Sequence, residues 1–437
     1  MFFNELSFSV FFAVVFCIYW RCDSARRQTF VLAIASLMFY GYWDWRLLLL
    51  LIISVAWTYW FALRRWNVAM GISGLLLPLC FFKYFNFIAG TSYNIILPLG
   101  ISFYTFTSIG YLLDVRWGRQ IPERDFINFW SYITFFPQIV AGPIVRASDM
   151  LPQYRRLRVF KYSLAVDGAR QFLWGLFKKV VVADVAAEFV DKVYYGISVN
   201  TGSTLVIGAI LYAVQIYADF SGYSDMALGV GKLLGIHLPI NFKYPYFASN
   251  IGDFWRRWHI SLTSWFRDYL YIPLGGSRVA FGHIVFNTWV VFVLSGLWHG
   301  AAWTYVIWGA VHAIFLTVRL LYRRFSNVQL YSGVSTFLTL TSVVFGWIFF
   351  RSSDFVTASQ YLSKIFSAST FSVPLLPVRP LVFSVLMLMT EFVHRNCEHG
   401  LSIRCQFPPL RYLVYFLLIF SIFAFSPDKS GFIYSQF

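Results

Sequence analysis

The chain has 437 residues, of which 59% are hydrophobic and only 12% charged, and its formal net charge is +16. A soluble globular domain carries about 25% charged residues. So few charges cannot supply the polar surface that a water-soluble fold of this length needs. The composition therefore excludes an ordinary soluble protein and indicates an integral membrane protein surrounded by a lipid bilayer.

The basic residues follow the apolar segments, and no nucleic-acid-binding motif is present. Arginines cluster at residues 21–27, 64–65, 155–158 and 319–324, each between apolar runs. Basic residues accumulate in the cytoplasmic loops of membrane proteins. We therefore expect residues 21–27 and 64–65 to be cytoplasmic and the N-terminus to lie outside, and we expect no nucleic-acid partner.

Apolar runs recur along the whole chain and predict an all-α integral membrane protein, with residues 1–437 as one domain. Proline, glycine and polar residues interrupt several runs, so we expect roughly ten or more transmembrane helices plus re-entrant and interfacial helices. The first run lacks the basic n-region of a signal peptide and is predicted to be the first span. The runs are residues 6–20, 30–42, 47–63, 68–88, 95–113, 129–144, 205–217, 285–297, 301–321, 337–350, 381–389 and 410–425.

Polar residues are costly inside a membrane and mark functional sites by default; here they concentrate between residues 98 and 312. Pro98 and Gly100 precede a hydroxyl-rich run that ends at Val115, and interhelical packing is the preferred interpretation of its hydroxyl groups. Two prolines within residues 135–146 exclude an ordinary straight span. A re-entrant turn and a kinked packing helix both fit that segment.

Residues 172–193 carry charges between apolar stretches. An interfacial amphipathic helix would place Lys178 and Lys179 at lipid headgroups. Asp184 is not explained by that arrangement and is a candidate supporting residue. The five cysteines of the chain are scattered without CxxC spacing, so we expect no metal site.

Residues 217–229 contain two aspartates close together, Asp219 and Asp225, with small residues between them. Paired carboxylates could serve acid/base chemistry or bind a cation. Alternatively, the segment is a structural turn whose aspartates cap helices. The structural interpretation is preferred, and both aspartates stay candidate supporting residues.

Residues 254–278 combine arginines, aromatic residues and a histidine. Helical spacing predicts an amphipathic interfacial helix with His259 turned inward. Arg256 and Arg257 point elsewhere, toward lipid phosphates or an acyl donor. Asp268 is expected to pair with a neighbouring arginine.

Residues 294–316 place a histidine inside an apolar segment, with Trp298 before it. Histidine within a membrane span indicates a functional role. Gly296 and Gly300 remove side-chain bulk beside His299, so something can approach it closely. His312, farther along the run, is the weaker candidate.

These motifs resemble those of the membrane-bound O-acyltransferase (MBOAT) superfamily. FWRRWHISLTSWFRDYLYIPLGG and GLWHGAAWTYVIWGAVH are similar to its two histidine motifs. DFSGYSDMA, FFPQIVAGPI, KKVVVAD and PLGISFYTF are similar to its bacterial alginate O-acetyltransferase branch. The resemblance is strongest over residues 98–316.

The resemblance implies helices around a reaction tunnel, with His299 and His259 as the catalytic histidines. It also implies a multi-pass protein of the bacterial inner (cytoplasmic) membrane that passes acetyl groups to an extracytoplasmic, alginate-like polysaccharide. Acetyl-CoA is the expected acyl donor, and no cofactor is expected to be bound permanently. A periplasmic SGNH-type acetyltransferase, or another polysaccharide-modifying protein, is the expected partner.

An acyltransferase needs a base that takes a proton from the acceptor hydroxyl, and a neutral imidazole suits that task. An acyl-histidine intermediate is a second possibility. Arg256, Arg257, Lys178 and Lys179 are candidates for binding the donor phosphates. Alternatives are acetyl transfer to peptidoglycan, D-alanyl or other acyl transfer to a cell-wall polymer, a proton-coupled transporter and a structural scaffold.

Overall fold

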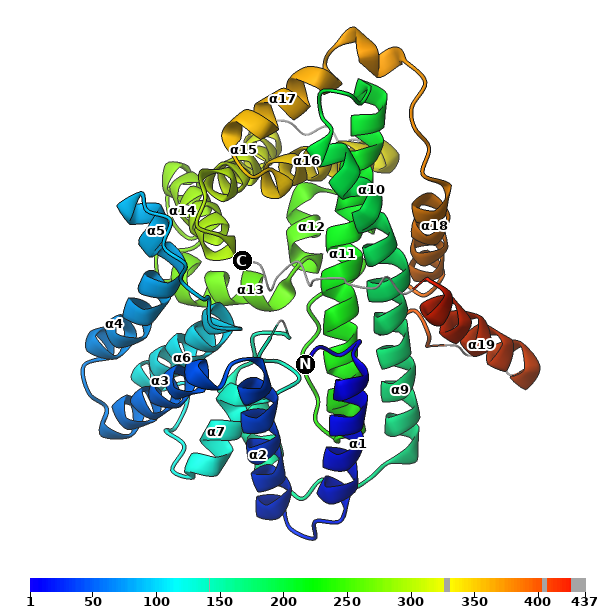
Figure 1. Cartoon of the computed structure of the whole chain (residues 1–437). Helices are drawn as coiled ribbons and strands as arrows, with labels where there is room; N and C mark the ends of the chain where they lie inside the picture. The colour runs from blue at the N-terminus through cyan, green and yellow to red at the C-terminus, as the bar shows by residue number, and fades with distance from the viewer. Residues whose placement is uncertain (141, 326–330, 403–406, 426–437) are drawn as a thin grey trace. The chain divides into compact units, whose positions relative to one another are not determined.

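The computed structural model describes residues 1–140, 142–325, 331–402 and 407–425 (Figure 1). All regular elements within these ranges are helices, which confirms the all-α prediction. The chain divides into two compact units with interleaved sequences. Unit 1 comprises residues 1–172 and 223–240, and unit 2 comprises residues 173–222 and 241–437.

Unit 1 begins with helices that follow the predicted apolar runs. The N-terminal helix has the predicted bounds, 6–20, and the 68–88 run forms three consecutive helical pieces. The helices that lie wholly in unit 1 are α1 (Leu6–Trp20), α2 (Ala25–Trp43), α3 (Trp45–Arg64), α4 (Val68–Leu79), η1 (Cys80–Tyr84), α5 (Phe85–Ala89), α6 (Ile101–Arg116), α7 (Phe126–Thr134) and α8 (Ala147–Tyr154).

Two helices carry the chain from one unit to the other, α9 (Tyr162–Phe177) and α11 (Gly202–Leu233). The remaining helices belong to unit 2 and include two π-helical segments, η2 and η4. They are η2 (Lys178–Ala183), α10 (Asp184–Tyr195), η3 (Pro245–Phe247), α12 (Ile251–Arg257), α13 (Ile260–Phe266), η4 (Arg267–Tyr271), α14 (Phe281–His299), α15 (Trp303–Phe325), α16 (Ser332–Arg351), α17 (Phe355–Ile365), η5 (Ala368–Phe371), α18 (Val378–Val393) and α19 (Pro408–Ala424).

Six helices of the described chain are long and apolar enough to cross a membrane. They are Trp45–Arg64, Val68–Ala89, Gly202–Leu233, Phe281–His299, Trp303–Phe325 and Ser332–Arg351. Leu6–Trp20 and Pro408–Ala424 are apolar but shorter. The prediction of a multi-pass membrane protein is thus confirmed. The number of described helices that are long and apolar enough to cross a membrane is smaller than the roughly ten or more spans expected.

The proline-containing segment after α7 forms turns, not a kinked helix. Residues 136–140 are turns, and Phe135, Phe136 and Ile139 are buried. A Cβ atom at Gly100 would collide with the carbonyl oxygen of Ile139. Gly100 also has a φ of +69°, a left-handed conformation that glycine adopts without strain. The break before α6 and the turn after α7 therefore pack against each other in unit 1.

In unit 2, α15 packs against both α14 and α16 (Figure 1). Small residues allow close contact between α14 and α15. A Cβ atom at Gly296 would meet the carbonyl oxygen of Tyr305, and one at Gly309 would meet that of Phe292. Close backbone approach at small residues is a common way to join helices in membranes. This helix pair fixes the position of His299, the last residue of α14.

Candidate active site

His259 lies at a break between two short helices. α12 ends at Arg257, α13 begins at Ile260, and His259 itself has a φ of +41°. The predicted continuous amphipathic helix is therefore wrong, because the chain changes direction at this residue. The Ile260 N–H donates to the carbonyl oxygen of Asn241 at 2.8 Å and anchors the turn. A left-handed conformation is strained for a residue with a Cβ atom, and such strain is often found at functional sites.

The predicted inward orientation of His259 is confirmed, since only 1% of its surface is exposed. Its imidazole meets Phe220 edge to face at a ring-centroid distance of 4.7 Å and lies 5.7 Å from Trp298. Burial lowers the pKa of His259 to about 3, because desolvation disfavours the charged imidazolium. His259 is therefore neutral near neutral pH.

His299 is also buried, with 3% of its surface exposed. Its ring is surrounded by Trp298, Trp308 and Phe350, at centroid distances of 5.0, 5.1 and 5.2 Å. These aromatic rings surround the imidazole on several sides. The histidine thus sits in apolar surroundings at the end of α14.

The two histidines lie together, although 40 positions separate them in the sequence. The centroids of His259 and His299 are 6.3 Å apart, and Trp298 contacts both rings. All three residues belong to unit 2. The structure therefore brings together His259, His299 and Trp298, which the sequence motifs singled out.

The glycines beside His299 have a packing role. A Cβ atom at Gly300 would meet the aromatic ring of Tyr305, and one at Gly296 would meet the backbone oxygen of Tyr305. The close approach predicted at these glycines occurs, and the approaching group is the neighbouring helix α15. They are therefore explained by the contact between α14 and α15.

Lys179 is the centre of a buried ion-pair cluster. Its Nζ atom lies 2.8 Å from an oxygen of Asp184 and 2.8 Å from an oxygen of Asp219. Lysine and both aspartates are at most 5% exposed. The predicted interfacial position of Lys179 is therefore wrong, and its charge neutralises carboxylates inside unit 2.

Lys178 is buried as well and faces other partners. Its Nζ atom donates to the Ser221 hydroxyl at 2.9 Å and lies 3.6 Å from a carboxylate oxygen of Glu391. Tyr217 donates its hydroxyl to the other oxygen of Glu391 at 2.8 Å. The predicted headgroup position is wrong here too, and the burial of both lysines argues against a role in binding donor phosphates.

Asp219 and Asp225 do not form a pair. Residues 217–229 lie within the continuous helix α11, so the preferred interpretation as a turn with caps is wrong. Six residues advance an α-helix by about 600°, which places the two carboxylates on different faces. Asp225 accepts a hydrogen bond from Gln171 at 2.8 Å within unit 1, and Asp219 belongs to the cluster in unit 2.

The arginine pair lies at the surface and contacts Asp253. One oxygen of that carboxylate lies 3.3 Å from Arg256, and the other oxygen lies 3.0 Å from Arg257. The Arg256 side chain is 67% exposed, so its role with headgroups or donor stays a prediction. The expected local partner of Asp268 is confirmed as Arg267, at 2.7 Å.

Sequence reasoning missed Glu391 and ranked His312 below His299. Glu391 is 1% exposed, and the signal was an acid next to the apolar run 381–389. His312 is fully buried, with Trp255 and Trp308 at centroid distances of 4.9 and 5.0 Å. The ring of Trp308 contacts both His312 and His299.

The described residues contain no cluster of three or more metal-ligating side chains. The candidate site itself contains two buried imidazoles in an aromatic environment. Such a site can accept and return a proton, and it keeps water away from reactive groups.

Residues 119–351 match the model of the membrane-bound O-acyltransferase family. The chain belongs to this family, and it is an O-acyltransferase with bacterial relatives. It is 36% identical over 393 residues to a probable alginate O-acetylase AlgI of Pseudomonas putida, covering 84% of this chain and 80% of the relative.

Two further relatives extend the comparison. A peptidoglycan O-acetyltransferase of Helicobacter pylori is 36% identical over 386 residues, covering 76% of this chain and 72% of the relative. A teichoic acid D-alanyltransferase of Bacillus subtilis is 28% identical over 315 residues, covering 64% and 76%. Family membership removes the transporter and scaffold alternatives.

Proposed function

We propose that this chain transfers acetyl groups from a cytoplasmic thioester donor, acetyl-CoA, across the inner membrane to an extracytoplasmic polysaccharide of the alginate type. The single observation that carries the proposal is the buried pair His259 and His299, 6.3 Å apart between ring centroids. The aromatic surroundings of the pair exclude water, which would otherwise hydrolyse a thioester donor.

The pair fits the acid/base demands of acyl transfer. The acceptor hydroxyl must lose its proton as it attacks the thioester carbonyl, and the departing thiolate must gain one. His299 takes the proton from the hydroxyl in this proposal, and His259 positions the reacting group or acts as the second acid/base residue. Proton transfer by a positioned side chain contributes about 10²–10⁴-fold to the rate.

Neutral imidazole is the form that this role requires. Burial lowers the pKa of His259, so its imidazole stays neutral near neutral pH, with a proton on one ring nitrogen and not on the other. Exclusion of water also protects the thioester from hydrolysis. A reaction tunnel that leads donor and acceptor to the two rings remains part of the proposal.

Acetyl is preferred over D-alanyl because both O-acetylating relatives are 36% identical to the chain, whereas the D-alanyltransferase is 28% identical. Peptidoglycan is the second candidate acceptor, since its relative reaches the same identity as the alginate enzyme. A periplasmic SGNH-type protein is proposed as the partner that completes transfer to sugar hydroxyls.

Cells that express the chain and receive labelled acetate test the acceptor directly. Label recovered as alkali-labile ester on exopolysaccharide supports the proposal. Ester label confined to peptidoglycan would assign the second candidate, and labelled D-alanine esters on a wall polymer would contradict acetyl transfer.

A further inference from the structure

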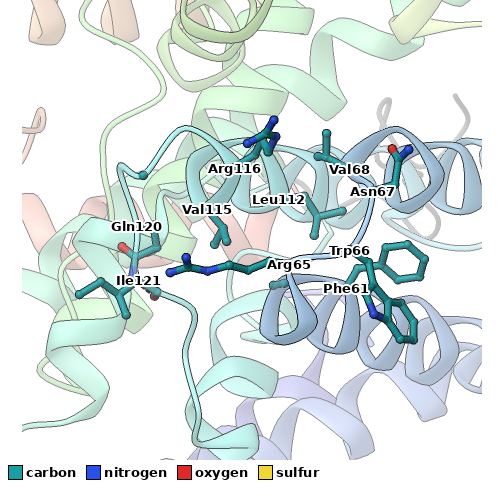
Figure 2. Close-up of a pocket in the computed structure, with 12 residues that line it drawn as sticks. Phe61, Arg65, Trp66, Asn67, Val68, Leu112, Val115, Arg116, Gln120 and Ile121 are labelled. Atoms are coloured by element: carbon teal, nitrogen blue, oxygen red, sulfur yellow. Dashed lines mark hydrogen bonds between the residues drawn. The ribbon is translucent and has the colours of Figure 1, made fainter.

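Unit 1 contains a pocket of about 660 Å³, and none of its lining residues has a role in the proposed acyl-transfer chemistry (Figure 2). It is lined by the end of α3, the turn to α4, and the end of α6 with the residues that follow it. α6 packs against both α3 and α4. Pockets that bind small molecules have volumes of about 300–1,000 Å³, so this one can hold a substantial ligand.

The pocket has one apolar part and one polar part. Phe61, Leu112 and Val115 supply apolar side chains. Arg65 and Arg116 supply guanidinium groups, and Figure 2 shows the Arg65 side chain extended along the pocket toward Gln120. A ligand that combines an anionic group with a hydrocarbon chain would match both parts.

The two arginines of the pocket differ from their neighbours. Arg119 lies 3.9 Å from Asp114, and Arg64 lies over the ring of Trp60. Within the described ranges, neither Arg65 nor Arg116 lies within 4.0 Å of a carboxylate oxygen. Both charges are therefore available to an anion, and a planar guanidinium suits the geometry of phosphate.

Arg65 also occupies a conformation that glycine would adopt more easily. It ends α3 with a φ of +50°, in the left-handed region. A residue with a Cβ atom is strained there. Arginine at this strained position places a guanidinium group in the pocket, which glycine could not do.

The pocket lies where two candidate spans end. Residues 65–67 join Trp45–Arg64 to Val68–Ala89, both apolar enough to cross a membrane. Trp66 is 55% exposed in this turn, as expected for an aromatic side chain at the membrane–water interface. The distribution of arginines assigns this turn to the cytoplasmic side, where anionic lipids attract basic residues.

We propose that this pocket binds an anionic membrane phospholipid. Arg65 and Arg116 hold its headgroup phosphate, Gln120 contributes a polar contact, and an acyl chain lies along Phe61 and Leu112. A soluble phosphate compound would satisfy the arginines but not the apolar side chains, and this favours the lipid.

Native mass spectrometry of the full chain in detergent tests the proposal, with phosphatidylglycerol, phosphatidylcholine and coenzyme A as separate probes. The wild type should retain phosphatidylglycerol about tenfold more strongly than phosphatidylcholine. The double variant Arg65→Gln/Arg116→Gln should lose that preference. Arg64→Gln, next in sequence but outside the pocket, should keep it.

Thermal unfolding checks that each variant is folded. If the Arg65→Gln/Arg116→Gln variant does not fold, Arg65→Lys/Arg116→Lys replaces it, because lysine keeps both positive charges but lacks the planar guanidinium. Retention of phosphatidylglycerol by a folded double variant would overturn the proposal. Equal loss in Arg64→Gln would overturn it too, because general surface charge would then explain the binding. Coenzyme A bound more tightly than phosphatidylglycerol, and released by the double change, would assign the pocket to a soluble phosphate.

Discussion

The two buried histidines show how local surroundings decide what a residue can do. His259 is held in a left-handed turn, and His299 ends a long helix, yet their rings face the same aromatic group, Trp298. Both rings are shielded from water. Burial lowers the pKa of His259 and keeps its imidazole neutral near neutral pH.

The pH dependence of stability tests the burial of His259. Its pKa is lowered to about 3 in the folded chain, whereas an unfolded histidine titrates near 6.5. Below about pH 6.5 the unfolded state binds one more proton at this position, so stability falls by up to about 1.4 kcal/mol per pH unit. Above that pH the effect is absent.

Thermal unfolding of the wild type and His259→Gln between pH 7.5 and 5 measures this effect. The wild type should lose more stability on acidification than the variant. Identical pH slopes would show that His259 is protonated as readily in the folded chain as in the unfolded chain.

Trp298 should act by positioning the two imidazoles. Trp298→Phe keeps an aromatic ring, whereas Trp298→Ala removes the ring that lies beside both His259 and His299 and lets the two imidazoles move. We expect Trp298→Ala to lower acetyl transfer by about 10²-fold, the size of effect that a small displacement at a reacting centre can have. Trp298→Phe should retain most activity.

Acetyl transfer at equal membrane abundance of the Trp298 variants measures that difference. Full activity in Trp298→Ala would show that the tryptophan does not hold the histidines in place.

For individual residues, the sequence was informative where a short local motif identifies the residue. His259, His299 and Trp298 stand in distinctive short motifs, and the structure brings their rings close together. Their catalytic roles stay a prediction. Glu391 was missed because its partner Tyr217 is 174 positions away, and no local pattern reports such a contact. Lys178 and Lys179 were misplaced because lysine beside apolar residues usually lies at a membrane interface.

Secondary-structure elements hold the site through charges and through glycine contacts. η2 brings Lys179 to the carboxylates of α10 and α11, and a π-helical segment of this kind is often found at functional sites. α14 and α15 pack closely at Gly296 and Gly309. The sequence predicted most helices and the interruptions at prolines and glycines, but not the break at His259, because that break is anchored by a contact with Asn241.

Removal of the Lys179 charge tests the cluster. Lys179→Met leaves Asp184 and Asp219 buried without their shared cation, and breaking a buried ion pair costs about 3–5 kcal/mol. Lys192→Met, at an exposed position of α10, should change stability by about 0.5 kcal/mol or less. Adding Asp219→Asn to Lys179→Met should recover part of the loss.

Thermal unfolding of these variants in detergent measures the differences. Equal stability of Lys179→Met and Lys192→Met would contradict the role of the buried cluster.

The contact between α14 and α15 has a matched pair of glycines for its test. Gly296→Ala would press a methyl group against the backbone of Tyr305, whereas Gly282, on the same helix, has no neighbour within 4 Å of an added Cβ atom. Overpacking costs about 1–3 kcal/mol, and alanine is favoured over glycine in a helix by up to about 1 kcal/mol. Gly296→Ala should therefore destabilise the protein and reduce acetyl transfer, and Gly282→Ala should do neither.

Unfolding temperatures and acetyl transfer of the two glycine variants provide the measurement. A Gly296→Ala protein as stable and as active as the wild type would show that the helices tolerate a wider spacing.

At the scale of the whole molecule, composition and apolar runs were sufficient to predict an all-α membrane protein. Six helices of the described residues are long and apolar enough to cross a membrane, fewer than the roughly ten spans expected, and several runs form short helices and turns. The segment after α7 illustrates the reason, since its prolines and its contact with Gly100 favour turns over a helix. Family membership then supplies the reaction class that composition alone could not.

The central claim is that the chain transfers acetyl groups through the buried histidine pair. Polymer O-acetylation in cells that carry the wild type, His299→Ala or His259→Ala at equal membrane abundance tests it most directly. His299→Ala should reduce ester formation by about 10²-fold or more, and His259→Ala should also reduce it. Full acetylation with a folded His299→Ala protein would contradict the account.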